Sequence, residues 1–268
     1  MNITQFYIAY IGLLGLIIGS FLNVCIYRIP RRFSLSSPIR SYCPNCEVTL
    51  RTRDNIPVLS WLFLGGKCFN CKERIPFRYP FVEILSGFAA LECYLAFGLT
   101  WTALVIYALV AALITITFID LDFKIIPNLI TYPGIHCGLL LGLISENTQA
   151  FAWPVTQSAY DSLLGMYVGG GIFWSIAWVY TFFTKQDGLG GGDIKLMAMT
   201  GGILGYKSVI HSIFNGTALG AVVALFMIIF AGGGRKTQIP FGPWLSLGTI
   251  LYLCKINLFD HYLQLLLR

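Results

Sequence analysis

Apolar residues occur in long, nearly unbroken stretches, and polar residues are confined to shorter segments between them. A helix needs about 20 predominantly apolar residues to cross the hydrocarbon layer of a membrane. We predict a transmembrane helix in each of eight places: 6–26, 80–97, 101–119, 129–144, 162–183, 194–210, 216–231 and 244–258. The fourth, sixth and seventh stretches are short or rich in glycine, so seven spans stay open as an alternative.

The composition supports the same fold class. Of 268 residues, 56% are apolar and only 11% are charged, which is more apolar surface than one soluble core can bury. We therefore predict an all-α polytopic membrane protein of about eight transmembrane helices. Its expected parts are a first transmembrane helix (1–27), a polar domain between helices 1 and 2 (28–78) and a helical bundle (79–268).

The positions of Lys and Arg predict the orientation, because basic residues are retained in cytoplasmic loops. Residues 28–78 carry ten of the eighteen basic residues, so we place this segment in the cytoplasm and both termini outside. Eight spans then place five further basic residues inside: Lys124, Lys185, Lys195, Arg235 and Lys236. The net charge of +6 is explained by this topology and by contact with membrane lipid, and we expect no nucleic-acid partner.

Two Cys-x-x-Cys motifs lie in the polar segment, at Cys43 and Cys46 and at Cys68 and Cys71, with 21 residues between them. Four thiolates in two such pairs form the tetrahedral shell of a structural zinc site, so we predict a small zinc-ribbon-like domain. Two disulfides or an iron–sulfur cluster are the alternatives. A cytoplasmic position argues against disulfides, because thiols are kept reduced there. With few apolar residues of its own, the domain is expected to unfold without metal.

Carboxylates at the ends of the apolar stretches are the candidate catalytic groups. A charge near hydrocarbon costs roughly 2.5 to 3.5 kcal/mol, so an acid retained there is a functional-site hypothesis. Asp193 follows three glycines at the start of one stretch, and Asp120 ends another on the same predicted side of the membrane. Asp122, two residues further on, is the competing candidate. Glu83 is open to two interpretations: stabilisation by its own helix dipole, or contact with the polar domain or a cation.

Two carboxylates at one interface can share a proton, because like charges a few ångströms apart do not both ionise cheaply. One carboxylate then acts as a base on water, and the protonated partner polarises a carbonyl group. The glycines at 190–192 let a peptide backbone approach closely. Asp120 and Asp193 therefore predict aspartic-protease chemistry.

Several segments in this order resemble the bacterial type IV prepilin peptidases, bifunctional membrane aspartic proteases of the Gly-x-Gly-Asp kind. The resemblance covers nearly the whole chain. It rests on Gly-Ser-Phe-Leu-Asn-Val at 19–24, the two cysteine pairs, Asp-Asn-Ile-Pro-Val-Leu-Ser-Trp at 54–61, Tyr-Pro-Phe-Val-Glu at 79–83, Asp120 with Ile-Pro-Asn at 126–128, and Gly-x-Gly-Asp at 190–193.

The resemblance implies cleavage of the short basic leader of type IV prepilins or pseudopilins at the cytoplasmic face of the bacterial inner membrane. It also implies N-methylation of the new terminus with S-adenosylmethionine, for which the chain shows no glycine-rich strand-to-helix motif. By the same resemblance, Asp120 and Asp193 match the catalytic aspartates and the four cysteines match the zinc-linked domain. Glu47 stands where family members often have glycine. The Pro-Phe-Gly-Pro stretch at 240–243 is near the family's active site, although by itself it indicates only a kinked helix end.

Two other classes of protein remain as alternatives. An ion-coupled transporter also uses aspartates and glycine-broken helices, but it predicts inverted repeats that the sequence does not show. A zinc-stapled membrane scaffold leaves Asp120 and Asp193 without a role. The sequence does not indicate an oligomeric state or the pilus or secretion system that is served.

Overall fold

The structure is a computed structural model that describes residues 2–38, 40–185, 190–230 and 240–255. Within these ranges the regular secondary structure is helical, and extended pairing is limited to two isolated β-bridges. The chain divides into two compact units, Met1–Thr115 and Ile116–Arg268, which are described one at a time. Arg235, Lys236 and the end of the last predicted span lie outside the described residues.

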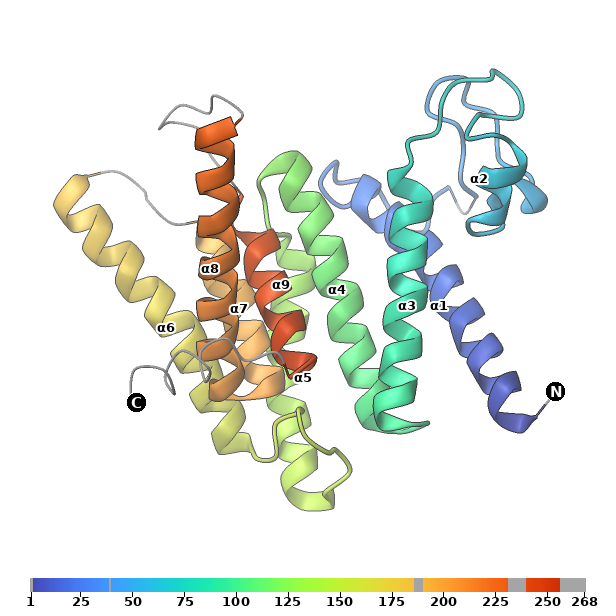
Figure 1. The fold of residues 1–268 in the computed structure, drawn as a ribbon. Coiled ribbons are helices and arrows are strands. Elements are labelled where there is room, and N and C mark those ends of the chain that lie inside the picture. Colours follow the sequence, from blue (N-terminus) through green and yellow to red (C-terminus); the bar gives the residue numbers. More distant parts are fainter. Residues whose placement is uncertain (1, 39, 186–189, 231–239, 256–268) are drawn as a thin grey trace. The chain divides into compact units, whose positions relative to one another are not determined.

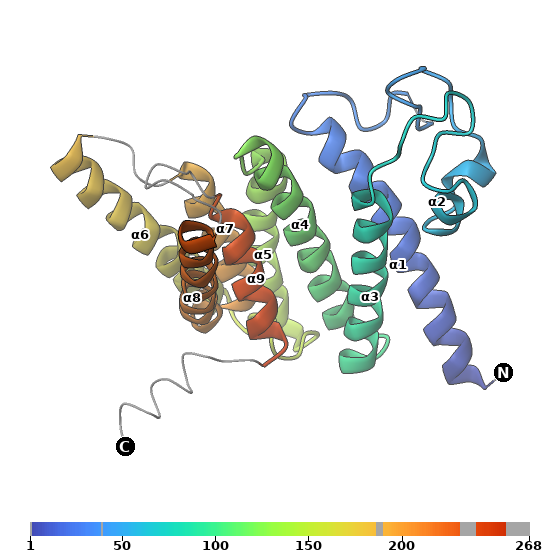
Figure 2. The same cartoon turned by 45° about the horizontal axis from the view of Figure 1, so that its top comes forward.

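The N-terminal unit contains α1 (Ile3–Arg28), η1 (Thr52–Asn55), α2 (Leu59–Phe63), α3 (Arg78–Phe97) and the first part of α4 (Trp101–Phe123). α1 and α3 lie side by side, and the segment with η1 and α2 connects the end of α1 to the start of α3 (Figures 1 and 2). A Cβ at Gly19 would lie 2.6 Å from the Glu83 Cα, so small residues allow this close approach. Asn23 Nδ2 donates to the Tyr79 carbonyl at 3.0 Å and so links α1 to the start of α3.

The C-terminal unit contains α5 (Asn128–Thr148), α6 (Ala159–Thr184), α7 (Gly191–Leu204), α8 (Tyr206–Phe230) and α9 (Gly242–Leu253). α7 contacts each of the other four helices of this unit (Figure 1). Most of its residues are buried. Gly165 of α6 lies against the backbone of Gly201, and Gly169 lies against that of Met197. These glycines let α6 and α7 approach closely, whereas Gly171 faces open space.

Six helices of the described chain are long and apolar enough to cross a membrane: α1, α3, α4, α5, α6 and α8. α7 has 14 residues and α9 has 12. At about 1.5 Å per residue, both are shorter than a hydrocarbon layer of about 30 Å. Each predicted span has a helix near it, but a count of eight spans stays a prediction.

The predicted span at 194–210 is wrong in its end point. The chain breaks at Gly205, which has a φ of +78°, and α8 begins at Tyr206. α8 therefore starts ten residues before the predicted span at 216–231. The hydropathy of the sequence does not show the break, because apolar residues lie on both of its sides: Ile203, Leu204 and Val209. All three are buried in the structure.

Candidate functional site

Asp120 lies in the last turn of α4 and is buried, with 5% of its surface exposed. The backbone N–H of Gly242, at the start of α9, donates to Asp120 Oδ2 at 3.1 Å. α4 ends three residues later, and Lys124, with a φ of +54°, turns the chain toward α5. The carboxylate is therefore held by a backbone donor from a helix 122 residues away.

Asp193 is the third residue of α7 and is also buried. Its backbone N–H donates to the Gly190 carbonyl at 3.1 Å, which closes the first turn of the helix. The first turn is where the helix dipole favours a carboxylate. Gly190 and Gly191 are exposed, so the buried acid lies directly behind an open backbone segment.

Ile126 lies between the segments that carry the two acids. A Cβ at Gly192 would be 2.8 Å from the Ile126 Cβ, and a Cβ at Gly242 would be 3.1 Å from the Ile126 Cδ1. The same two segments reach the acids: a Cβ at Gly190 would lie 3.2 Å from Asp193 Oδ2, and a Cβ at Gly242 would lie 2.7 Å from Asp120 Oδ2. The ends of α4, α7 and α9 thus form one acidic site around Ile126.

Asp122 is exposed, unlike Asp120. Two residues along a helix correspond to a rotation of about 200°, so the two side chains leave α4 on nearly opposite faces. This geometry favours Asp120 over Asp122 as the partner of Asp193.

Lys195 connects the start of α7 to the start of α5. Its Nζ donates to Asn128 Oδ1 at 2.7 Å and lies 5.3 Å from the centroid of the Tyr132 ring. Asn128 belongs to the Ile-Pro-Asn motif that follows Asp120. The contact therefore couples the two sequence motifs that carry the two acids.

The four cysteines Cys43, Cys46, Cys68 and Cys71 form one cluster, with their Sγ atoms all within 4.8 Å of one another. The Sγ atoms of Cys43 and Cys71 are 3.8 Å apart, and none of the four is in a disulfide. Tetrahedral zinc with Zn–S bonds of about 2.3 Å requires sulfur atoms about 3.8 Å apart. The cluster therefore fits a metal ion, and the alternative of two disulfides is wrong for this structure.

Hydrogen bonds prepare one of these sulfurs for metal binding. The backbone N–H of Val48 and the side chain of Asn70 lower the pKa of Cys46 to about 6. This thiol is mostly a thiolate at neutral pH, and the thiolate is the form that binds metal.

The two Cys-x-x-Cys motifs have the same backbone geometry. The residues that follow them, Glu47 and Lys72, have φ values of +57° and +61°. Both donate their N–H to the carbonyl of the first cysteine of their motif, at 2.8 Å and 3.1 Å. A left-handed backbone is thus required at Glu47, a conformation that glycine adopts without strain.

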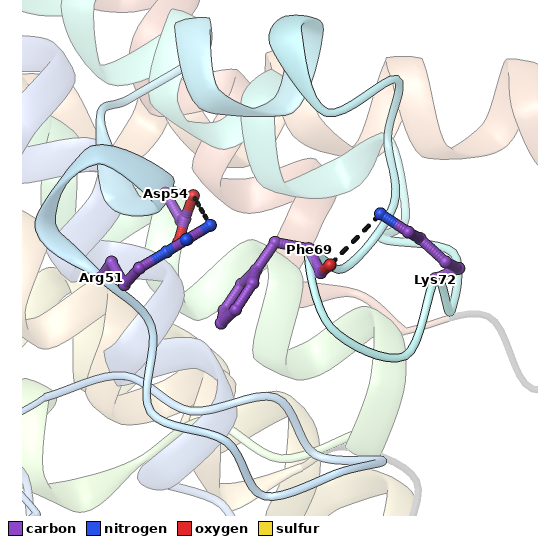
Figure 3. Close-up of polar contacts among 4 residues, drawn as sticks. All are labelled: Arg51, Asp54, Phe69 and Lys72. Atoms are coloured by element: carbon purple, nitrogen blue, oxygen red, sulfur yellow. Dashed lines mark hydrogen bonds and ion pairs between the residues drawn. The ribbon is translucent and has the colours of Figure 1, made fainter.

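A cluster of Arg51, Asp54 and Phe69 joins η1 to the second cysteine motif (Figure 3). Arg51 Nε lies 2.6 Å from Asp54 Oδ2, and the guanidinium carbon lies 3.9 Å from the centroid of the Phe69 ring. The hydrogen bond from Arg51 lowers the pKa of Asp54. Lys72 Nζ donates to the Phe69 carbonyl at 3.2 Å, as Figure 3 also shows.

Glu83 lies in the second turn of α3 and is buried. Its Oε2 accepts the backbone N–H of Val58, at the start of α2, at 2.7 Å. Of the two interpretations that the sequence left open, contact with the polar segment is the one observed.

Gly242 and Ile126 are the residues of the acidic site that sequence reasoning did not assign. The Pro-Phe-Gly-Pro stretch at 240–243 and the Ile-Pro-Asn motif at 126–128 were the available signals. Neither motif shows which acid it contacts. Asp187, which precedes the glycines, lies outside the described residues.

Comparison with known proteins gives consistent matches along the chain. Residues 13–97 match the bacterial peptidase A24 N-terminal domain, and residues 107–225 match the type IV leader peptidase family. The chain is 34% identical to the prepilin leader peptidase/N-methyltransferase of Pseudomonas aeruginosa, over 94% of this chain and 92% of that protein. It is 36% identical to a type 4 prepilin-like proteins leader peptide-processing enzyme of Escherichia coli, over 88% of this chain and 89% of that protein. No solved structure gives a significant match.

Proposed function

Because the chain belongs to the type IV leader peptidase family, we propose that it removes the leader peptide from type IV prepilins or pseudopilins and N-methylates the new terminus. The observation that carries the peptidase half is the pair of buried acids, Asp120 and Asp193, at the joined ends of α4, α7 and α9. Both sequence motifs that the resemblance assigned to catalysis contribute to this site.

The reaction needs one ionised and one protonated carboxyl group. The ionised member of the pair takes a proton from water, and the resulting hydroxide adds to the scissile carbonyl carbon. The protonated member donates to the carbonyl oxygen, and the departing amine then takes up a proton as the C–N bond breaks. Gly242 keeps the Asp120 carboxylate oriented throughout, because its donor is a backbone N–H that cannot rotate away.

The protein is a multi-pass inner-membrane enzyme, with six described helices of membrane length. We place residues 28–78 in the cytoplasm and both termini outside, on the distribution of Lys and Arg. Eight crossings, with α7 and α9 as the short ones, and the division into 1–27, 28–78 and 79–268 belong to this proposal.

The metal we assign to the cysteine cluster is zinc. Four sulfurs within 4.8 Å of one another, with those of Cys43 and Cys71 3.8 Å apart, suit its preferred structural shell. Zinc would be held by Cys43, Cys46, Cys68 and Cys71 and would fix the fold of the segment rather than take part in hydrolysis. S-adenosylmethionine is the methyl donor that the methyltransferase activity implies.

The test is to incubate the purified full-length protein with a prepilin and S-adenosylmethionine and to measure the product by mass spectrometry. We expect loss of the leader and addition of one methyl group at the new N-terminus. An uncleaved prepilin, under conditions in which a relative from Pseudomonas aeruginosa cleaves it, would overturn the proposal.

A further inference from the structure

A cavity of about 210 Å³ lies within the N-terminal unit, between the last turns of α1, the first turns of α3 and the segment that carries the cysteines. α1 contributes Ser20, Val24 and Tyr27 to its lining, and α3 contributes Tyr79 and Glu83. Asp120 and Asp193 belong to the other unit. The proposed peptidase reaction therefore gives this cavity no role.

Glu83 gives the cavity a buried carboxyl group. Its Oε2 accepts the backbone N–H of Val58 and its carboxyl group also accepts a hydrogen bond from the Ser20 side chain, but no basic side chain among the described residues forms an ion pair with it. The nearby Asp54 carboxylate, by contrast, is paired with Arg51. A buried carboxylate without a cation is costly, so this geometry favours a cationic ligand.

Two basic residues, Arg28 and Arg74, also line the cavity, and neither forms an ion pair with Glu83. The guanidinium group of Arg28 is hydrogen-bonded to backbone carbonyls. It donates to the carbonyls of Ser34, Leu35 and Pro38 at 3.0, 3.2 and 2.9 Å. Arg28 thus fixes the chain after α1 and does not neutralise Glu83.

The remaining walls are rich in aromatic rings: Tyr27, Tyr42, Trp61, Phe69 and Tyr79. Trp61 is held in place by a hydrogen bond from its Nε1 to the Ile75 carbonyl at 3.0 Å. Aromatic faces stack on purine bases and attract cations. The cavity volume of about 210 Å³ is below the roughly 300 to 1,000 Å³ of pockets that bind drug-sized ligands. A nucleoside as large as a drug-sized ligand would therefore fill the cavity and extend out of its opening.

We propose that this cavity binds S-adenosylmethionine and that Glu83 lies against its positive charge. The inference rests on the proposed methyltransferase activity. When bound, the donor supplies a methyl group on a cationic sulfur. The lone pair of the pilin amine forms the new C–N bond, the C–S bond breaks with its electron pair left on sulfur, and the amine proton passes to water. Glu83 and the aromatic walls hold and orient the donor.

The test measures binding by calorimetry on the zinc-loaded full-length protein in detergent. We expect Glu83→Gln to weaken S-adenosylmethionine binding by at least about tenfold, because glutamine keeps the acceptor for Val58 and loses only the charge. Binding of S-adenosylhomocysteine, whose sulfur is neutral, should weaken less. The matched control is Glu92→Gln on the exposed side of the same helix, which should leave both affinities within about twofold.

The zinc content of each variant checks that the domain is folded. Val24→Phe, which adds bulk to the wall without altering charge, should also weaken donor binding. Unchanged donor affinity in both Glu83→Gln and Val24→Phe would overturn the proposed binding site. If the wild-type protein still methylated its product, the proposed methyltransferase function would stand. A wild-type protein that neither bound the donor nor methylated its product would overturn both.

Discussion

The backbone N–H of Gly242 donates to Asp120 Oδ2 at 3.1 Å and so joins the start of α9 to the end of α4. A Cβ at Gly242 would lie 2.7 Å from the same oxygen. The approach that makes this hydrogen bond possible therefore excludes a side chain. α9 contributes to the acidic site through its backbone, at a position where only glycine fits.

Replacement of the paired acids should abolish leader cleavage. We expect Asp120→Asn and Asp193→Asn each to lower the rate by at least about 10²-fold, because an amide neither accepts a proton from water nor donates an acid proton. Asp122→Asn should stay within about threefold, because Asp122 is exposed. The measurement is single-turnover cleavage of a prepilin. Loss of activity in Asp122→Asn alone would show that our choice of pair is wrong.

Gly242→Ala should lower cleavage by at least about tenfold, because the new methyl group would displace the Asp120 carboxylate. The control is Gly171→Ala in α6, where an added Cβ meets no atom within 4 Å. That variant should keep full activity and gain a little helix stability. Equal activity of the two variants would contradict a role for the Gly242 contact.

Two neighbouring glycines of α7 provide a second matched comparison. An added Cβ at Gly192 would lie 2.8 Å from the Ile126 Cβ, whereas one at Gly191 meets nothing within 4 Å. We expect Gly192→Ala to reduce both the thermal stability and the cleavage rate, because α7 must move away from Ile126. Gly191→Ala should retain the wild-type melting temperature. If Gly191→Ala lowers cleavage at unchanged stability, the open backbone there contacts the substrate.

Removal of the metal should unfold the cysteine domain. The wild-type protein is expected to bind one zinc ion per chain, and a strong chelator or Cys68→Ser should make residues 41–76 sensitive to protease. Native mass spectrometry gives the zinc content, and limited proteolysis followed by peptide mapping gives the site of cleavage. Full zinc content in a variant that lacks both Cys68 and Cys71 would refute the assigned ligands.

The left-handed backbone at Glu47 predicts that glycine is tolerated better than a β-branched residue at this position. Glu47→Gly should be neutral or stabilising, whereas Glu47→Val should cost about 1 to 2 kcal/mol, because a branched side chain is strained at a φ of +57°. Chelator titration of the folded domain measures the difference as a shift in the zinc-release midpoint. The opposite order, with valine better than glycine, would contradict this backbone conformation.

The sequence predicted the features that depend on local composition. The apolar stretches placed a helix near each predicted span, and the cysteine spacing placed the metal cluster. The acid pair followed from two motifs on one predicted side of the membrane. Each of these patterns can be recognised within a short segment of the sequence.

Features that depend on tertiary contacts were not predictable in the same way. The break at Gly205 lies between two apolar stretches, so the span predicted from hydropathy combined α7 with the first turn of α8. The bond between Gly242 and Asp120 connects segments far apart in the chain. The hydrogen bond from Val58 to Glu83 joins residues 25 positions apart, and the local sequence of neither residue indicates it.

α7 is surrounded by α5, α6, α8 and α9 and is about 21 Å long, shorter than the hydrocarbon layer is thick. Gly190 and Gly191 at its start are exposed, while Asp193 and most later residues are buried. Hydrolysis consumes water, so we expect water to reach Asp193 from the exposed start of this helix. In the topology proposed above, the start of α7 lies at the cytoplasmic surface, and we expect the scissile bond to reach the acids there in extended form. The part of a substrate that lies in the lipid could then stay helical during cleavage.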